Sequence, residues 1–453
     1  MAESTNTIQK EIQDREAKEK RELRRKRRRR NQILAILTLL LFVCLIVAII
    51  GTGVWYIMHR GAGKTAGGGA ATTEETTIDN LFESEDEIVK PEETNTEPAL
   101  TPEQQLDAIL DEAFISQMPL EDKVAGLFIV TPESITGVNK AVKAGDGTKD
   151  ALNKYAVGGI VYASQNMQDA AQFTEMVSNT TLYSRYALFT CVAEEGGSST
   201  SLEKAGLADK TDSEQAMGTG ADAAKAYEAS GKIADSMLTY GLNLNFAPVA
   251  DLATVQDSYL KDASYGSDAA LAASFVTSAV QGMQEKGISS CLKYFPGAAD
   301  MKEDPAKGMA TSERTAEQLA AEEFTVFKAG IDAGADMVMV GHVAVPAITG
   351  DNTPCSLSSA VVTDKLRNEL GFNGVIITDA MNKGAITEYY EADEAAILAL
   401  KAGCDMILCP DDFEKAYNGV LEAVQNGTIS EERINDSLRR IYRIKYAGMK
   451  PEA

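Results

Sequence analysis

Short apolar runs recur through residues 105–450 and alternate with segments rich in alanine and charged residues. The runs have the length and composition of strands that are buried on both faces, and the segments between them have the composition of helices. Eight such repeats in one domain predict an α/β fold, the (β/α)8 or TIM-type barrel. The predicted strands are 124–130, 159–163, 187–193, 242–248, 288–295, 336–342, 374–379 and 405–409.

Charged residues and one histidine lie at or near the carboxyl ends of five of these runs. Active sites of (β/α)8 barrels lie at this end of the strands, where the loops that follow them meet. We therefore expect these side chains to gather at one mouth of the barrel. The residues are Glu195, Asp251, Lys293, His342 and Asp379.

A different pattern precedes the predicted barrel. Residues 33–58 are almost all apolar, and a helix of that length, at about 1.5 Å per residue, crosses a hydrocarbon core of roughly 30 Å. The basic run 24–30 comes just before it, and basic residues beside a span stay in the cytoplasm. The sequence predicts a basic cytoplasmic tail (1–32), one transmembrane helix (33–58) in the cell membrane and an extracellular C-terminal domain. A cleavable signal peptide is the alternative, although its apolar region would be shorter.

Between the apolar run and the predicted barrel, residues 59–104 are rich in glycine, alanine, threonine and glutamate, which predicts a disordered acidic linker. The formal net charge of the chain is −24, and residues 1–32 carry a net +6, so that about −30 remains for the rest. A domain this acidic is not expected to bind nucleic acid. Neutral or cationic partners are expected instead.

The cysteines and histidines exclude some kinds of site. Five of the six cysteines follow residue 58, without the dense regular spacing of a disulfide framework, and we expect them to be buried thiols. His59 and His342 are the only two histidines, too few for a histidine-based metal centre. No glycine-rich phosphate loop follows a predicted strand. We expect neither a metal nor a cofactor.

Two segments resemble signatures of glycoside hydrolase family 3, in particular its single-domain β-N-acetylhexosaminidases. Residues 371–379, GFNGVIITD, agree with the strand motif that ends in the family's nucleophile, which implies that Asp379 is a nucleophile. Residues 293–306, KYFPGAADMKEDPA, resemble the acid/base loop in part. The resemblance covers nearly all of 105–450 and implies a retaining glycosidase with a glycan as partner. It implies substrate contacts for Lys293, Asp251, His342 and Glu195.

The chain departs from the family pattern at six positions where the family's side chains hold the sugar or move a proton. Ala306 stands at the position of the acid/base histidine, so its side chain cannot transfer a proton. Asp304, a carboxylic acid in the same loop, is the candidate substitute if its pKa is raised. The other departures are Ala193, Ser201, Ala263, Tyr294 and Ala298.

Four of the predicted site residues also have a structural alternative. Asp379 could cap the helix that follows it, and Lys293 could belong to an ion pair that serves only the fold. His342 could be a hydrogen-bonded residue of the barrel wall. Asp304 could be a solvated acid of the loop.

Two functions therefore remain open. The first is a membrane-anchored extracellular glycoside hydrolase of the β-N-acetylhexosaminidase type, retaining, with an altered or impaired acid/base step. Its expected partner is a glycan, such as a cell-wall polymer that contains N-acetylglucosamine. The second is a catalytically inactive glycan-binding or scaffold protein at the cell wall. The sequence does not decide between turnover and binding, or name the sugar and linkage.

Overall fold

The computed structural model describes residues 106–447, except 107, 112, 113, 199, 261 and 299. The predicted tail (1–32), transmembrane helix (33–58) and linker (59–104) lie outside the described residues. Within the part that is described, no helix combines the length and apolar character needed to cross a membrane.

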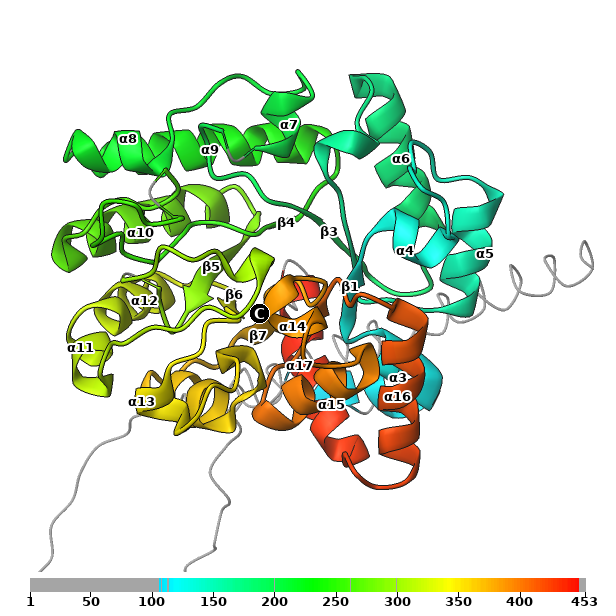
Figure 1. The fold of residues 1–453 in the computed structure, drawn as a ribbon. Helices are drawn as coiled ribbons and strands as arrows, with labels where there is room; N and C mark the ends of the chain where they lie inside the picture. The colour runs from blue at the N-terminus through cyan, green and yellow to red at the C-terminus, as the bar shows by residue number, and fades with distance from the viewer. Residues whose placement is uncertain are drawn as a thin grey trace, which may run out of the picture. The chain divides into compact units, whose positions relative to one another are not determined.

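Eight parallel strands form one sheet in the order β7-β6-β5-β4-β3-β2-β1-β8. A parallel bridge between Ile377 and Met406 joins β7 to β8 and closes the sheet. The predicted (β/α)8 barrel is therefore confirmed (Figure 1). The strands are β1 (Phe128–Val130), β2 (Gly159–Val161), β3 (Phe189–Val192), β4 (Leu244–Asn245), β5 (Ser289–Phe295), β6 (Met337–Val340), β7 (Val375–Thr378) and β8 (Ile407–Leu408).

The start of the first predicted strand was wrong. Residues 124 and 125 belong to helix α3 (Leu120–Ala125), although valine favours strands. Pro119 precedes the first turn, and the Gly126 N–H closes the last turn on the Asp122 carbonyl at 2.9 Å. The buried face of this helix packs against the barrel, so tertiary packing decides the conformation of Val124.

Every strand is followed by one or more helices, and these surround the strands (Figure 1). Those after β1 to β4 are α4 (Pro132–Thr136), α5 (Asp146–Lys154), η2 (Ser164–Asn166), α6 (Ala170–Tyr183), α7 (Ser201–Lys204), α8 (Glu214–Thr219), α9 (Ala224–Thr239) and α10 (Ala269–Gln284). Those after β5 to β8 are η3 (Pro305–Lys307), α11 (Ala316–Ala321), α12 (Glu323–Asp332), α13 (Pro346–Thr349), η4 (Cys355–Leu357), η5 (Ala360–Glu369), α14 (Gly384–Thr387), α15 (Ala392–Ala402), α16 (Phe413–Gln425) and α17 (Glu431–Lys445). The short helix η1 (Ile115–Gln117) precedes α3.

The core fills the space inside the strands and between the strands and the helices. All residues of β1, β3, β6 and β7 are buried, which is why their sequences are continuous apolar runs rather than alternating ones. The five cysteines within the described residues are free thiols; four are buried and Cys409 is half-buried. The expectation of buried thiols holds for these five.

A buried carboxylate ties the closing strands to the last helix. Asp405, just before β8, accepts hydrogen bonds from the Ile376 N–H of β7 at 2.9 Å and from the Ser437 hydroxyl of α17 at 2.8 Å. Its oxygens also lie 2.7 Å from Arg367 of η5 and 3.0 Å from Arg440 of α17. This carboxylate therefore connects the strand that precedes Asp379 to two helices outside the barrel.

Candidate active site

A cavity of about 270 Å³ opens where the loops that follow the strands meet. Four of the residues selected from the sequence line it: Glu195, Asp304, His342 and Asp379. Two tyrosines that sequence reasoning did not select as site residues also line it, Tyr259 and Tyr294. Lys293 and Asp251 do not line the cavity, but each contacts a residue that lines it. The cavity therefore brings together side chains from five successive strands, β3 to β7, and the loops that follow them.

Asp379 directly follows β7, and its carboxylate is held at both oxygens. Its Oδ1 accepts a hydrogen bond from the Ala380 N–H at 2.7 Å, and its Oδ2 lies 2.6 Å from the Lys383 Nζ. Burial acts to raise the pKa of Asp379, but the Lys383 ammonium group and the Ala380 N–H outweigh it and hold that pKa below the usual value. The carboxylate is therefore ionised, and each oxygen keeps a second lone pair that could attack a ligand.

The glycine before β7 allows this strand to reach its position. A Cβ atom at Gly374 would lie 2.4 Å from the Asp336 carbonyl oxygen and 2.5 Å from the Phe372 ring. A larger residue would thus separate β7 from the segment before β6. Gly374 therefore allows β7 to pack closely against the segment before β6. This packing helps to set the position of Asp379, which follows the other end of the strand.

Lys383 is a site residue that sequence reasoning missed. Residues 380–383 form a turn in which the Lys383 N–H donates to the Ala380 carbonyl at 3.2 Å, and this turn brings the ammonium group back to Asp379. The ammonium also lies 5.2 Å from the centroid of the Tyr294 ring, and Lys293 lies 5.4 Å from the same centroid. Two cations therefore flank one aromatic ring. A lysine four residues after a candidate nucleophile was the signal in the sequence.

Lys293 forms the ion pair that the sequence left open as its alternative role. Its ammonium donates to the Glu195 carboxylate, and only 2% of Lys293 is exposed. Asp251 is also buried, and its Oδ2 accepts from the Tyr294 N–H at 3.0 Å. Burial raises the pKa of Asp251 well above its usual value. Both residues hold lining residues in place from behind, Lys293 through Glu195 and Asp251 through Tyr294.

His342 is a fully buried residue that supports the turn after β7. Its Nε2 lies 3.0 Å from the Ala380 carbonyl oxygen, and its Nδ1 lies 2.8 Å from the Ser356 hydroxyl. Because a carbonyl only accepts, Nε2 must carry the proton and Nδ1 must accept from the serine. Burial lowers the pKa of His342 and favours this neutral form. These contacts agree with the alternative role given for His342 above, a hydrogen-bonded residue of the barrel wall.

The loop after β5 places Asp304 and Ala306 on the same cavity as Asp379. The Asp304 Oδ1 accepts the Ala306 N–H at 2.9 Å and so caps the short helix η3. Asp300 has a different role, since its oxygens accept from the Ser312 hydroxyl at 2.7 Å and the Glu313 N–H at 3.0 Å. The cavity thus combines an ionised carboxylate with a loop whose position 306 carries only a methyl group.

Residues 119–444 match the sequence profile of the glycosyl hydrolase family 3 N-terminal domain. The match covers most of the chain and all eight strands. The chain belongs to glycosyl hydrolase family 3.

Named relatives agree with this membership. A β-hexosaminidase of Stenotrophomonas maltophilia (strain R551-3) is 30% identical over 284 residues, which are 60% of this chain and 82% of the relative. A β-hexosaminidase of Xanthomonas campestris pv. campestris (strain B100) is 31% identical over 270 residues, 57% of this chain and 79% of the relative. The chain is therefore a β-hexosaminidase-like member of the family.

Solved structures of the family have the same fold. A family 3 β-N-acetylglucosaminidase from Paenibacillus sp. str. FPU-7 superposes with a TM-score of 0.69 at 32% identity, covering 74% of this chain and 64% of that one. A β-N-acetylhexosaminidase from Beutenbergia cavernae DSM 12333 gives 0.65 at 26% identity, covering 73% of this chain and 99% of that one. This chain thus spans slightly less than two thirds of the Paenibacillus structure.

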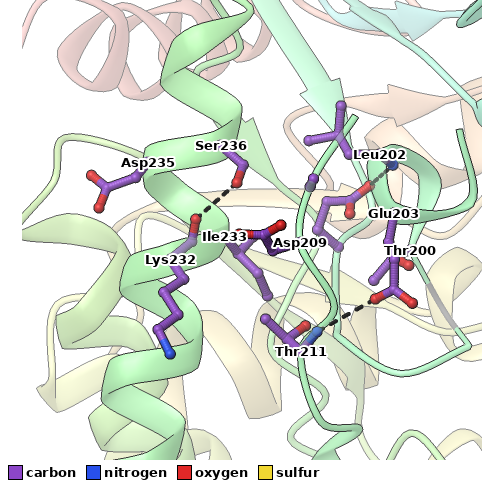
Figure 2. A pocket seen from close by; sticks show the side chains of 11 residues that line it. Thr200, Leu202, Glu203, Asp209, Thr211, Lys232, Ile233, Asp235 and Ser236 are labelled. Atoms are coloured by element: carbon purple, nitrogen blue, oxygen red, sulfur yellow. Dashed lines mark hydrogen bonds between the residues drawn. The ribbon is translucent and has the colours of Figure 1, made fainter. Parts of the chain in front are cut away.

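A second pocket, of about 240 Å³, lies between the loop after β3 and helix α9 (Figure 2). It shares no lining residue with the Asp379 cavity. Glu194 accepts hydrogen bonds there from the Ser201 and Leu202 N–H groups at 2.6 and 2.9 Å, and burial raises its pKa to about 7. These contacts hold together the loop that also contains Glu195.

Proposed function

We propose that this family 3 barrel is a retaining glycoside hydrolase of the β-N-acetylhexosaminidase type with an impaired acid/base step. The observation that carries the proposal is the ionised Asp379 carboxylate in a cavity that also contains the Asp304–Ala306 loop. The relatives that are named β-hexosaminidases support the class of substrate, a glycan with N-acetylhexosamine units.

In the proposed reaction a free electron pair of the Asp379 carboxylate attacks the anomeric carbon of the bound sugar. The bond from that carbon to the leaving oxygen breaks, and the oxygen takes the bonding electrons and needs a proton. Ala306 cannot supply this proton. Asp304 is the carboxylic acid of the loop that lies nearest to position 306 in sequence. Water then releases the sugar from Asp379, with net retention of configuration.

The leaving group should therefore control the rate. We expect a dinitrophenyl N-acetylglucosaminide, whose leaving phenolate needs no proton, to react measurably. A natural disaccharide of N-acetylglucosamine carries the same sugar but needs a proton on its leaving oxygen. It should therefore react about 10²- to 10⁴-fold more slowly than it would with a working general acid, because general acid catalysis is worth that much. The measurement is kcat/KM of the full-length protein for both substrates, with an aryl glucoside as control for the sugar. Equal rates for both leaving groups would contradict an impaired acid step.

The second candidate is a glycan-binding protein without turnover. It is favoured by the engagement of both Asp379 oxygens, in particular the ion pair with Lys383, because a paired carboxylate is a weaker nucleophile. The six departures at sugar-contacting positions point the same way. Calorimetric binding of N-acetylglucosamine oligomers, without any reaction of the dinitrophenyl glycoside, would support this candidate over the first.

We also propose that the barrel acts outside the cell, tethered to the membrane by residues 33–58, with cell-wall glycan as its partner. The basic residues of the tail and the apolar run that follows them support this topology. Protease added to intact cells is expected to release a soluble fragment that begins between residues 61 and 104. A barrel that stays protected until the cells are lysed would overturn the topology.

A further inference from the structure

Tyr259 lies in the segment between β4 and α10 and lines the same cavity as Asp379, Asp304 and Ala306. Its side chain is half-buried, and no hydrogen bond between described residues involves its hydroxyl group. A phenol hydroxyl is both a donor and an acceptor. Among the described residues, this hydrogen-bond donor of the cavity therefore has no partner.

The surroundings of Tyr259 keep its proton in place. Burial raises its pKa well above the usual value, and the neighbouring charges of Asp251, Asp379 and Asp304 act in the same direction. A phenolate among these carboxylates is disfavoured, so the phenol remains a donor at neutral and mildly basic pH. Tyr259 lines the same cavity as the candidate nucleophile and the carboxylate of the acid/base loop.

The other polar side chains of the cavity are less suited to give a proton to a leaving oxygen. Lys383 is paired with Asp379, and His342 has both ring nitrogens occupied by Ser356 and Ala380. Asp304 uses one oxygen to cap η3. Tyr294 also offers a phenol, but its ring lies between Lys293 and Lys383. Within the described part of the chain, Tyr259 makes no such contact.

We propose that Tyr259 is the catalytic proton donor of this site, in place of the side chain missing at Ala306. The inference rests on the proposed hydrolase function. As the bond between the anomeric carbon and the leaving oxygen breaks, that oxygen takes the phenol proton while Asp379 bonds to the carbon. In the second step water adds to the carbon, the bond to Asp379 breaks, and a proton from the water returns to the phenolate. Because the donor is a weak acid, natural glycosides are expected to be cleaved slowly.

The test compares two leaving groups in the full-length protein. Tyr259→Phe removes one hydroxyl group and should lower kcat/KM for N,N′-diacetylchitobiose by about 100-fold, at the lower end of general acid effects. The same variant should change kcat/KM for the dinitrophenyl glycoside by less than about threefold, because that leaving group needs no proton. Tyr294→Phe is the matched control, with the same chemical change in the same cavity, and should affect both substrates by one common factor.

The pH profile gives a second readout. With a phenol as donor, the disaccharide reaction of the wild type should not decline between about pH 7 and pH 9, since the ordinary tyrosine pKa is already about 10. A decline through neutral pH that disappears in Asp304→Asn would assign the proton to Asp304 and overturn the inference. Equal losses on both substrates in Tyr259→Phe, or no loss on either substrate, would also overturn the inference. A wild type that reacts with neither substrate overturns the hydrolase function itself, and this inference with it.

Discussion

Replacing Asp379 with alanine is expected to remove the reaction with activated aryl glycosides. The carboxylate is the group in the cavity that is both ionised and placed at the end of a rigid strand, and no water molecule at that position would form the covalent intermediate. Loss of a nucleophile typically costs about 10⁴-fold or more, so the rate of the variant should fall by at least that factor. The measurement is the release of dinitrophenolate by the full-length protein.

Lys383→Met is the matched control for this experiment, because it removes the ion pair but keeps the carboxylate. Without the ammonium group, burial becomes the stronger influence and the pKa of Asp379 should rise. Asp379 would then protonate at a higher pH. The acidic limb of the pH–activity profile should therefore shift to higher pH, while the reaction itself persists. A wild type and an Asp379→Ala variant with equal rates would remove Asp379 from the mechanism and favour the binding protein.

Replacing Asp405 with alanine is expected to lower the free energy of unfolding by about 3 to 5 kcal/mol, the usual cost of removing one partner from a buried ion pair. Asp405 is 0% exposed, and its carboxylate contacts Arg367, Arg440 and the Ile376 N–H. The variant would leave the two guanidinium groups without this carboxylate and would loosen the junction of β7 and β8.

The loss should be measured by urea unfolding of the full-length protein, and Asp411→Ala is the control. Asp411 lies in the loop after β8 and is exposed, so the same chemical change there should alter stability by no more than about 0.5 kcal/mol. If both variants unfold at the same urea concentration, the network around Asp405 does not stabilise the closure of the barrel.

The relation between these two positions links stability to the site. Asp405 holds β7 at its amino-terminal half through Ile376, and Asp379 follows the carboxyl end of the same strand. The Thr378 hydroxyl accepts the Leu408 N–H at 3.1 Å and so fixes that end to β8. The carboxylate of the proposed nucleophile is therefore positioned by contacts that also close the sheet.

The sequence by itself determined the barrel and the approximate positions of its strands. Runs that are buried on both faces must be apolar throughout, and this local requirement can be seen without knowing what each run packs against. The motif that ends at Asp379 was found through its resemblance to the family's strand signature, which was possible because Gly374 and the four residues of β7 form one continuous segment. The predicted strand residues 124 and 125 are helical, because packing there overrides the preference of valine.

Only the tertiary structure decided which side chains meet. Lys293 and Glu195 are 98 residues apart in sequence, and they form an ion pair because the closed sheet brings the ends of β3 and β5 together. Tyr259 belongs to a long loop without a periodic pattern, so its place beside Asp379 followed from the path of that loop over the barrel mouth. Lys383 reaches Asp379 through a turn rather than a helix. Contacts of this kind depend on distances between segments, which no local pattern of apolar and polar residues contains.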